Sequence, residues 1–211
     1  VFWDIDGDGF REQVGWVDAD DGLLAIDLNQ NSVIDDHSEL FGTSTIDGFT
    51  ILSDYDTNAD GLITNADAQF ADLLIWRDLD QDGRSDEGEL QSLDELSITE
   101  IDLAANSVNQ TNAGHDVTHI STYTFTEAGG GSVTRAVEDI WFNYDNVNSI
   151  YDPDFAFDPV AFFLPQLRGY GALPDLTFAL MSGYPGSDEL VPLVYDFSTR
   201  DIDALLADPA A

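Results

Sequence analysis

The sequence predicts an α+β fold, with paired helices around acidic loops, further acidic loops, a small antiparallel sheet and a short helical tail. Three observations predict this fold. Runs of alternating Asp and Asn residues are separated by short apolar segments between residues 56 and 90. Strand-like stretches follow between residues 98 and 143. Leucines at helical spacing return after residue 176, so acidic loops, sheet and tail come in that order.

The composition indicates a folded, strongly acidic protein. Its 211 residues are 43% hydrophobic and include 4 Trp, 7 Tyr and 13 Phe, which disordered acidic tails lack. The 42 Asp and Glu against 6 Lys and Arg give a formal net charge of -36, which disfavours nucleic acid and anionic membranes as partners. There is no Cys and no apolar run long enough for membrane insertion. Because the acids cluster at regular offsets, we expect the cationic partner to be a metal ion.

Residues 56–67 match a 12-residue calcium loop. Such a loop takes side-chain oxygens from positions 1, 3, 5 and 12, a backbone carbonyl from position 7 and often a water at position 9, and Gly at position 6 makes the turn. With Gly61 in the turn, the candidate ligand positions are Asp56, Asn58, Asp60, Leu62 through its carbonyl, Thr64 and Asp67.

Residues 78–89 match the same template a second time. A solvated Asp-rich turn would explain one such run, but two complete matches favour metal binding. All ligands are oxygens on flexible loops, which suits Ca²⁺ better than Mg²⁺, whereas zinc prefers His or Cys. Without an ion, neighbouring carboxylates repel by roughly 1 kcal/mol per pair in water, so calcium should become part of the fold. The candidate positions are Asp78, Asp80, Asp82, Arg84 through its carbonyl, Asp86 and Glu89.

Apolar spacing around the two loops predicts helices. Residues 66–76 carry Phe70, Leu73 and Leu74 at i, i+3 and i+4, which predicts one helix that ends the first loop and begins the second. Residues 49–55 predict an entering helix, and residues 90–96 predict a leaving helix. Together these elements predict a paired EF-hand.

Two further acidic stretches match the template incompletely. In the first, positions 1, 3 and 5 are acidic, but Gly15 occupies position 12. In the second, Ser32 replaces the turn Gly, and the closing acid falls one place late. Each stretch is either a calcium loop or a tight Asx-rich turn. The candidate ligands are Asp4, Asp6 and Asp8 in the first stretch, and Asp27, Asn29, Asn31 and Glu39 in the second.

The order of these motifs resembles a known family. "GWVDADDGLL", "DLNQN", "ELFG", two calcium loops and "LDELSI" follow one another as in the calcium-dependent self-processing module of large secreted RTX (repeats-in-toxin) proteins. The resemblance covers roughly residues 2 to 145. It implies that calcium folds the module, which then cleaves an Asp-Pro bond at its own N-terminal border; the new Asp end can become linked to a lysine amine. The N-terminal segment with that bond is missing here, so no catalytic residue is assigned and self-cleavage would require upstream residues.

Other motifs favour ordinary structure. The Asp-Pro bonds at residues 152–153, 158–159 and 208–209 lie downstream of the module, and we interpret them as loop punctuation. His115 and His119 would form a zinc pair only on a helix, but residues 117–126 alternate like a strand, which separates the two side chains by about 13 Å. Gly129 to Gly131 predict a hairpin turn between two strands.

We therefore expect three regions: a calcium-binding module over residues 1–145, a linker or surface wrap over 146–165, and an incomplete helical tail over 166–211. The chain begins without Met and ends at "DPAA", so we expect it to be part of a larger polypeptide whose other segments are partners. The predicted function is a calcium-binding module of a secreted bacterial RTX-like protein that folds on extracellular Ca²⁺. The alternatives are a self-cleaving, cross-linking element and a calcium-rigidified adhesin spacer.

Overall fold

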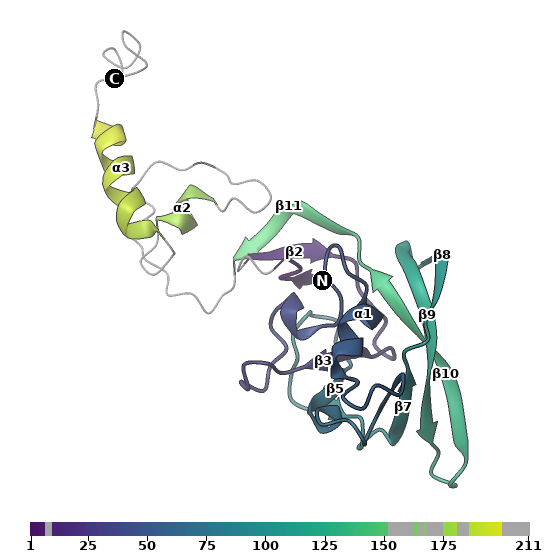
Figure 1. Cartoon of the computed structure of the whole chain (residues 1–211). Helices are drawn as coiled ribbons and strands as arrows, with labels where there is room; N and C mark the ends of the chain where they lie inside the picture. Colours follow the sequence, from purple (N-terminus) through teal and green to yellow (C-terminus); the bar gives the residue numbers. More distant parts are fainter. Residues whose placement is uncertain (7–9, 152–162, 164–166, 168–174, 181–185, 200–211) are drawn as a thin grey trace. The chain divides into compact units, whose positions relative to one another are not determined.

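The structure is a computed structural model that describes residues 1–6, 10–151, 163, 167, 175–180 and 186–199 (Figure 1). The chain divides into two compact units, Val1–Asp145 and Asn146–Ala211. The first unit contains loops 27–39, 56–67 and 78–89. No helix among the described residues is long and apolar enough to cross a membrane.

The described elements are mainly strands. The strands are β1 (Phe2–Trp3), β2 (Phe10–Val14), β3 (Leu23–Ile26), β4 (Leu62–Thr64), β5 (Leu73–Trp76), β6 (Leu90–Ser92), β7 (Ile98–Asp102), β8 (Asn106–Asn112), β9 (His115–Thr126), β10 (Ser132–Trp141) and β11 (Tyr144–Tyr151). The α-helices are α1 (Gly48–Leu52), α2 (Leu176–Ala179) and α3 (Ser187–Thr199), and the 3-10 helices are η1 (His37–Glu39), η2 (Ser53–Tyr55) and η3 (Phe70–Asp72).

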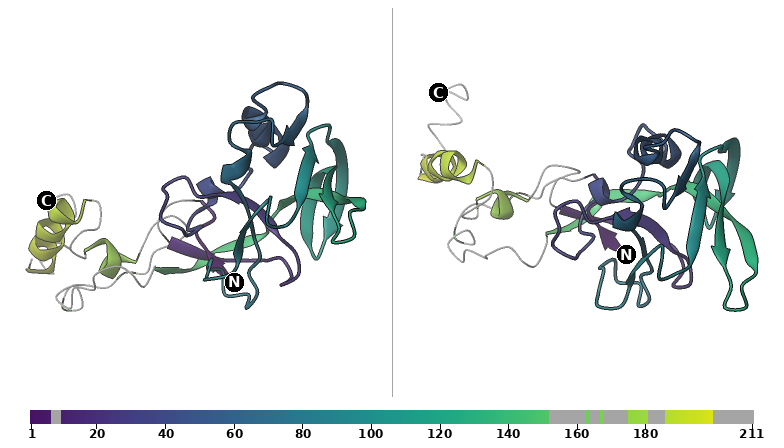
Figure 2. Two further views of the ribbon diagram at one scale, coloured as in Figure 1. Left: turned by 90° about the horizontal axis from the view of Figure 1, so that it is seen from below. Right: turned by 60° about the horizontal axis from the view of Figure 1, so that its bottom comes forward.

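The largest sheet has the strand order β10-β9-β7-β4, and β8 also pairs with β9. It forms one side of the first unit, beside the acidic loops (Figures 1 and 2). Strands β9 and β10 form a hairpin in which Thr126 pairs with Ser132. The Glu127 amide donates to the Gly131 carbonyl to close the turn. The strands and the glycine turn predicted for residues 98–143 are therefore confirmed.

The predicted helix over residues 66–76 is wrong. These residues form η3 and then β5, which pairs with β3 on one side and with β6 on the other. Leu73 and Trp76 are fully buried in two different cores. A strand presents alternate residues to opposite faces, so β5 can fill both cores at once, whereas a helix would bury one stripe. The neighbouring strands also bind the backbone groups of β5.

The paired EF-hand is therefore wrong, and so is the α+β class built on it. The first unit is dominated by three sheets. The entering helix shortens to α1 followed by η2, and residues 90–96 form β6 and a turn. Leu90 packs in the tryptophan core while Leu93 packs in the other core, which a single helix face does not allow.

Two hydrophobic cores hold the first unit together. One contains Trp3, Val14, Ala25, Ile34 and Trp76, with Trp16 packed against it. The other contains Ile26, Leu52, Ile63, Phe70, Leu73, Leu93, Ile98 and Ile101. Strands β3 and β5 contribute to both, so they lie between the two cores.

In the second unit, the described helices are short and pack on one another. Leu180 is buried after α2, and Leu190, Val191 and Val194 of α3 pack against it. Leu193 lies outside this contact and is exposed. The three downstream Asp-Pro bonds lie outside the described residues.

Candidate metal centres

Loops 27–39, 56–67 and 78–89 share one arrangement of hydrogen bonds. The carboxylate at position 1 accepts from the backbone amides at positions 5 and 6. The closing carboxylate accepts from the amides at positions 2 and 9. The side chain at position 5 accepts from the amide at position 7. Both oxygens of each end carboxylate therefore accept hydrogen bonds from backbone amides.

Loop 78–89 connects β5 to β6. Its first and last acids, Asp78 and Glu89, are 1% and 5% exposed. Asp78 accepts from Asp82 and Gly83 at 3.1 and 2.8 Å, Glu89 from Leu79 and Asp86 at 2.7 and 3.0 Å, and Asp82 from Arg84 at 2.8 Å.

Loop 56–67 follows α1 and η2 and contains β4. Strand β4 pairs with β7, so this loop is part of the largest sheet. Asp56 accepts from Asp60 and Gly61 at 3.2 and 2.8 Å, Asp67 from Thr57 and Thr64 at 2.8 and 2.9 Å, and Asp60 from Leu62 at 3.0 Å.

Loop 27–39 follows β3 and has the same pattern although it departs from the template. Glu39 lies at position 13, at the end of η1, and is 1% exposed. Its carboxylate still reaches the two expected amides. Asp27 accepts from Asn31 and Ser32 at 3.1 and 2.8 Å, Glu39 from Leu28 and Asp35 at 3.0 Å each, and Asn31 from Val33 at 2.8 Å.

The backbone of the three loops also agrees. Positions 4 and 6 adopt the left-handed conformation in each loop, which lets successive amides point inward. Ser32 takes this conformation at position 6, where the other loops have glycine. The φ angles are 60° and 66° at Gln30 and Ser32, 56° and 85° at Ala59 and Gly61, and 59° and 76° at Gln81 and Gly83.

Burial and hydrogen bonding affect the acids in different ways. Desolvation raises the pKa of Glu39, against the amides that lower it. Desolvation, followed by the charges of other carboxylates in its loop, raises the pKa of Asp80. Hydrogen bonds from backbone amides, that of Thr64 above all, lower the pKa of Asp67. Loop 78–89 therefore concentrates negative charge that a bound cation would neutralise.

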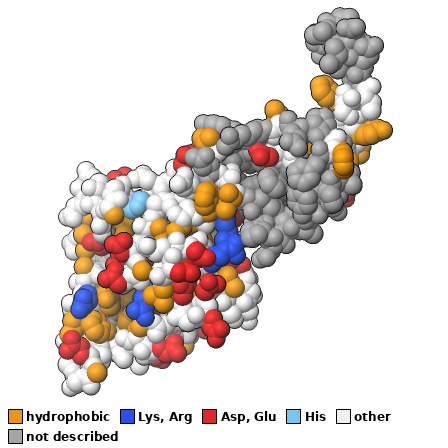
Figure 3. Space-filling model, turned by 180° about the vertical axis from the view of Figure 1, so that it is seen from behind, with side chains coloured by type: hydrophobic (Ala, Val, Ile, Leu, Met, Phe, Trp, Pro, Cys, Tyr) orange, Lys and Arg blue, Asp and Glu red, His pale blue; other side chains and the backbone are white. Residues whose placement is uncertain are grey.

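The donor set fits a hard cation. One carboxylate oxygen from each of Asp78, Asp80 and Asp82 lies within 4.8 Å of the others. Exposed acids are spread over the face of the first unit in Figure 3. All candidate donors in the three loops are oxygens, the ligands that Ca²⁺ takes in groups of 6 to 8. The candidate carbonyl donors Leu62 and Arg84 follow the turn in each complete loop.

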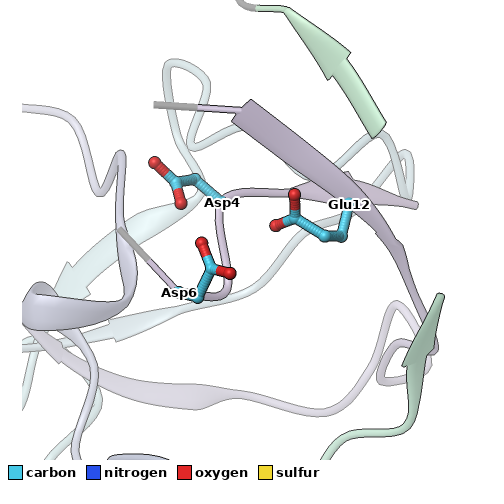
Figure 4. Close-up of side chains that lie close together, drawn as sticks. All are labelled: Asp4, Asp6 and Glu12. Atoms are coloured by element: carbon cyan, nitrogen blue, oxygen red, sulfur yellow. The ribbon is translucent and has the colours of Figure 1, made fainter. Parts of the chain in front are cut away.

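A fourth acidic group lies at the β1–β2 hairpin. Asp4 and Asp6 follow β1, and Glu12 comes from β2, where it pairs with Trp3 (Figure 4). One oxygen of each of these three carboxylates lies within 4.8 Å of the others. The loop template did not predict Glu12, and the polar run of residues 11–13 has no alternation that would single it out. The predicted ligand Asp8 lies outside the described residues.

Loops 27–39 and 78–89 are joined directly. The amide of Ile34 donates to the Ser85 hydroxyl at 2.7 Å, and both residues are buried. Ser85 is at position 8, where an apolar residue is usual in such loops. The Ser85 hydroxyl therefore links two candidate metal sites through a hydrogen bond.

The two histidines of "HDVTH" do not form a metal site with each other. Both lie on β9. The His115 Nδ1 accepts from the Asn143 amide at 3.1 Å, whereas the His119 Nδ1 lies 3.7 Å from Asp139. The prediction that residues 117–126 form a strand is confirmed.

Two comparisons with known proteins give matches. The family model of the SPM domain matches residues 1–143. The chain is similar to the "Iron-regulated protein FrpA" of Neisseria meningitidis serogroup C, with 37% identity over 184 residues that cover 83% of the chain. The match spans 16% of the length of that relative.

Proposed function

Because the chain belongs to the SPM domain family, we propose that it is a calcium-binding module of a secreted, bacterial RTX-like protein and that it folds on binding extracellular Ca²⁺. The observation that carries the proposal is the hydrogen-bond arrangement shared by loops 27–39, 56–67 and 78–89. Three separate segments converge on it despite different sequences. The similarity to FrpA and to the RTX module in sequence supports the secreted setting.

The loops are built for an ion with many oxygen ligands. In the folded module, backbone amides orient the two end carboxylates of each loop. A bound calcium ion would supply the positive charge that neutralises acids such as Asp78, Asp80 and Asp82. In loop 56–67, Asn58 replaces one acid, so less charge is available there. The group of Asp4, Asp6 and Glu12 is a fourth candidate site.

Calorimetry tests this function. Calcium in the range of roughly 10⁻⁵ to 10⁻³ M, as for extracellular modules, should convert the chain to a protease-resistant form with a higher melting temperature. At a concentration 100 times Kd, binding to the folded state alone adds about 2.7 kcal/mol per site. Magnesium at the same concentration serves as the control. An unchanged melting temperature between saturating calcium and excess chelator would refute the proposal.

A second candidate function is calcium-dependent cleavage of an Asp-Pro bond upstream of Val1. The location of the first residues favours it, because a Cβ on Gly83 would lie 2.9 Å from the Phe2 carbonyl oxygen, so the chain start lies against loop 78–89. The test uses a chain extended upstream with its natural residues. Calcium-dependent release of a peptide ending in Asp, identified by mass spectrometry, supports this function; an intact chain at saturating calcium contradicts it.

A further inference from the structure

Loop 78–89 differs from the other loops because indole groups reach both of its end acids. The Trp16 Nε1 donates to Asp78 Oδ2 at 2.7 Å, and the Trp76 Nε1 donates to Glu89 Oε2 at 3.5 Å. The Trp141 Nε1 instead donates to Thr118 and Asp139. Thus two of the four tryptophans of the chain hold the carboxylates of a single loop.

The same indoles belong to one aromatic cluster with the first strand. The ring centroids of Trp3 and Trp76 are 5.1 Å apart, those of Trp16 and Trp76 5.3 Å, and those of Trp3 and Trp16 5.9 Å. Trp3 lies in β1 and is fully buried. Trp16 therefore contacts a candidate metal ligand through its N–H and packs its ring against Trp3 of the N-terminal strand.

The loop backbone also contacts the chain start. A Cβ on Gly83 would lie 2.9 Å from the Phe2 carbonyl oxygen and 3.2 Å from the Val1 Cβ. The Val1 backbone nitrogen donates to the Val14 carbonyl at 3.0 Å, and the Val14 amide donates back to the Val1 carbonyl at 2.9 Å. The β1–β2 hairpin is thus closed next to the turn of loop 78–89.

We propose that Trp16 is a positioning residue that couples cation binding in loop 78–89 to the order of the β1–β2 hairpin. This inference rests on the proposed calcium binding. The indole N–H fixes the Asp78 carboxylate by a charge-assisted hydrogen bond, so an ion that uses the other lone pairs of Asp78 also fixes the indole. The fixed indole then holds Trp3, and with it β1.

Trp16→Phe tests the coupling, because Phe keeps an aromatic ring but has no N–H. Calcium is the probe, and the readouts are isothermal titration, indole fluorescence and hydrogen exchange of the hairpin amides. The variant should bind calcium about tenfold more weakly at loop 78–89, since it loses a hydrogen bond to a charged group. At saturating calcium its hairpin amides should also exchange faster than those of the wild type.

Trp141→Phe is the matched control, because it removes an indole N–H outside the loops. It should leave the calcium affinity of loop 78–89 and the hairpin protection unchanged. A folded Trp16→Phe variant with wild-type affinity and protection overturns the inference while the proposed function stands. No calcium binding by the wild type overturns both.

If Trp16→Phe does not fold, the coupling is tested on the wild-type protein. Calcium is titrated into the chelated protein while fluorescence and hairpin protection are followed. Fluorescence and hairpin protection must change at the same calcium concentration, and that concentration must be the binding midpoint of loop 78–89. The Glu89→Gln variant identifies which midpoint belongs to this loop. Separate midpoints for fluorescence and hairpin protection overturn the inference.

Discussion

Loops 56–67 and 78–89 have the same internal hydrogen bonds but different surroundings. Loop 56–67 is joined to the largest sheet through β4, and its first acid, Asp56, is only half-buried, whereas the first acid of loop 78–89, Asp78, is 1% exposed. Loop 78–89 packs its first acid against Trp16, its turn against the chain start and its Ser85 against loop 27–39. Local sequence determines the backbone conformation of a loop. Tertiary contacts determine which other parts of the protein change when the loop binds an ion.

The largest expected effect comes from the closing acids. Glu89→Gln places an amide opposite the N–H donors of Leu79 and Asp86 and removes a charge, so it should lower the affinity of its loop on the order of 100-fold. Asp67→Asn should cost loop 56–67 about tenfold, because that loop is more exposed and less charged. Isothermal titration of both variants measures the difference.

We also predict which loops lose affinity when the closing acid of a neighbouring loop is changed. The helix that would have joined the two sites is absent, and the direct link runs instead from Ser85 to Ile34. Glu89→Gln should therefore weaken binding in loop 27–39 as well, while Asp67→Asn affects mainly its own loop. In a Ser85→Ala background, Glu89→Gln should no longer weaken binding in loop 27–39. Equal, single-step losses in the Glu89→Gln and Asp67→Asn variants would show that the loops are equivalent.

The turn glycines provide the next comparison. Gly61 and Gly83 both have left-handed φ angles, so an alanine costs about 1 kcal/mol at either position. A Cβ on Gly61 meets no atom within 4 Å, whereas one on Gly83 meets the Phe2 carbonyl oxygen. Gly83→Ala should therefore lower the free energy of unfolding by roughly 1–3 kcal/mol more than Gly61→Ala.

Urea denaturation in saturating calcium measures both glycine variants. Gly83→Ala should also expose the β1–β2 hairpin to protease, which Gly61→Ala should not do. If the two variants lose the same stability and the hairpin stays protected in both, the contact between the loop and the chain start does not contribute to the free energy of unfolding.

The loops could be predicted from the sequence because their ligands are close together in the chain. For loop 27–39 the sequence allows either a calcium loop or an Asx-rich turn, because Ser32 and Glu39 depart from the template. The backbone tolerates both departures: Ser32 adopts the left-handed conformation, and η1 accommodates the additional residue before Glu39. The metal ligands themselves stay a prediction.

The flanking helices could not be predicted correctly because distant strands decide the conformation. The spacing of Phe70, Leu73 and Leu74 fits a helix face, but it also fits a 3-10 turn followed by a strand. Only the pairing of β5 with β3, which is remote in sequence, and with β6 across loop 78–89 distinguishes the two. Glu12 was missed for a similar reason, because its approach to Asp4 depends on the register of β1 and β2.

A smaller effect is expected from Ser32→Gly. Serine in the left-handed conformation costs about 1 kcal/mol relative to glycine, although glycine also increases the entropy of the unfolded chain. The variant should raise the melting temperature in saturating calcium slightly and strengthen binding in loop 27–39. A lower melting temperature would indicate that the added entropy of the unfolded chain and the loss of the Ser32 side chain outweigh the relieved backbone strain. Differential scanning calorimetry of the variant beside the wild type decides the sign.

The smallest expected difference between the loops is in their response to acid. Protons and cations compete for the same carboxylate oxygens. Desolvation, together with the charges of its neighbours, raises the pKa of Asp80 above its usual 3.8, so this group takes up a proton at a higher pH than an ordinary Asp. Amide hydrogen bonds lower the pKa of Asp67 below 3.8, so that group stays ionised as the pH falls further. Loop 78–89 should therefore lose calcium affinity at a higher pH than loop 56–67.

Calcium titrations at decreasing pH, followed residue by residue by NMR, measure this order. Asp80→Asn is the sharpest control, because it removes the group with the raised pKa from loop 78–89. Its affinity should be lower at neutral pH, but the loss on acidification should begin at a lower pH than in the wild type. If loop 56–67 loses calcium first, or if Asp80→Asn leaves the pH midpoint of loop 78–89 in place, then desolvation and charge at Asp80 do not set the acid response of this loop.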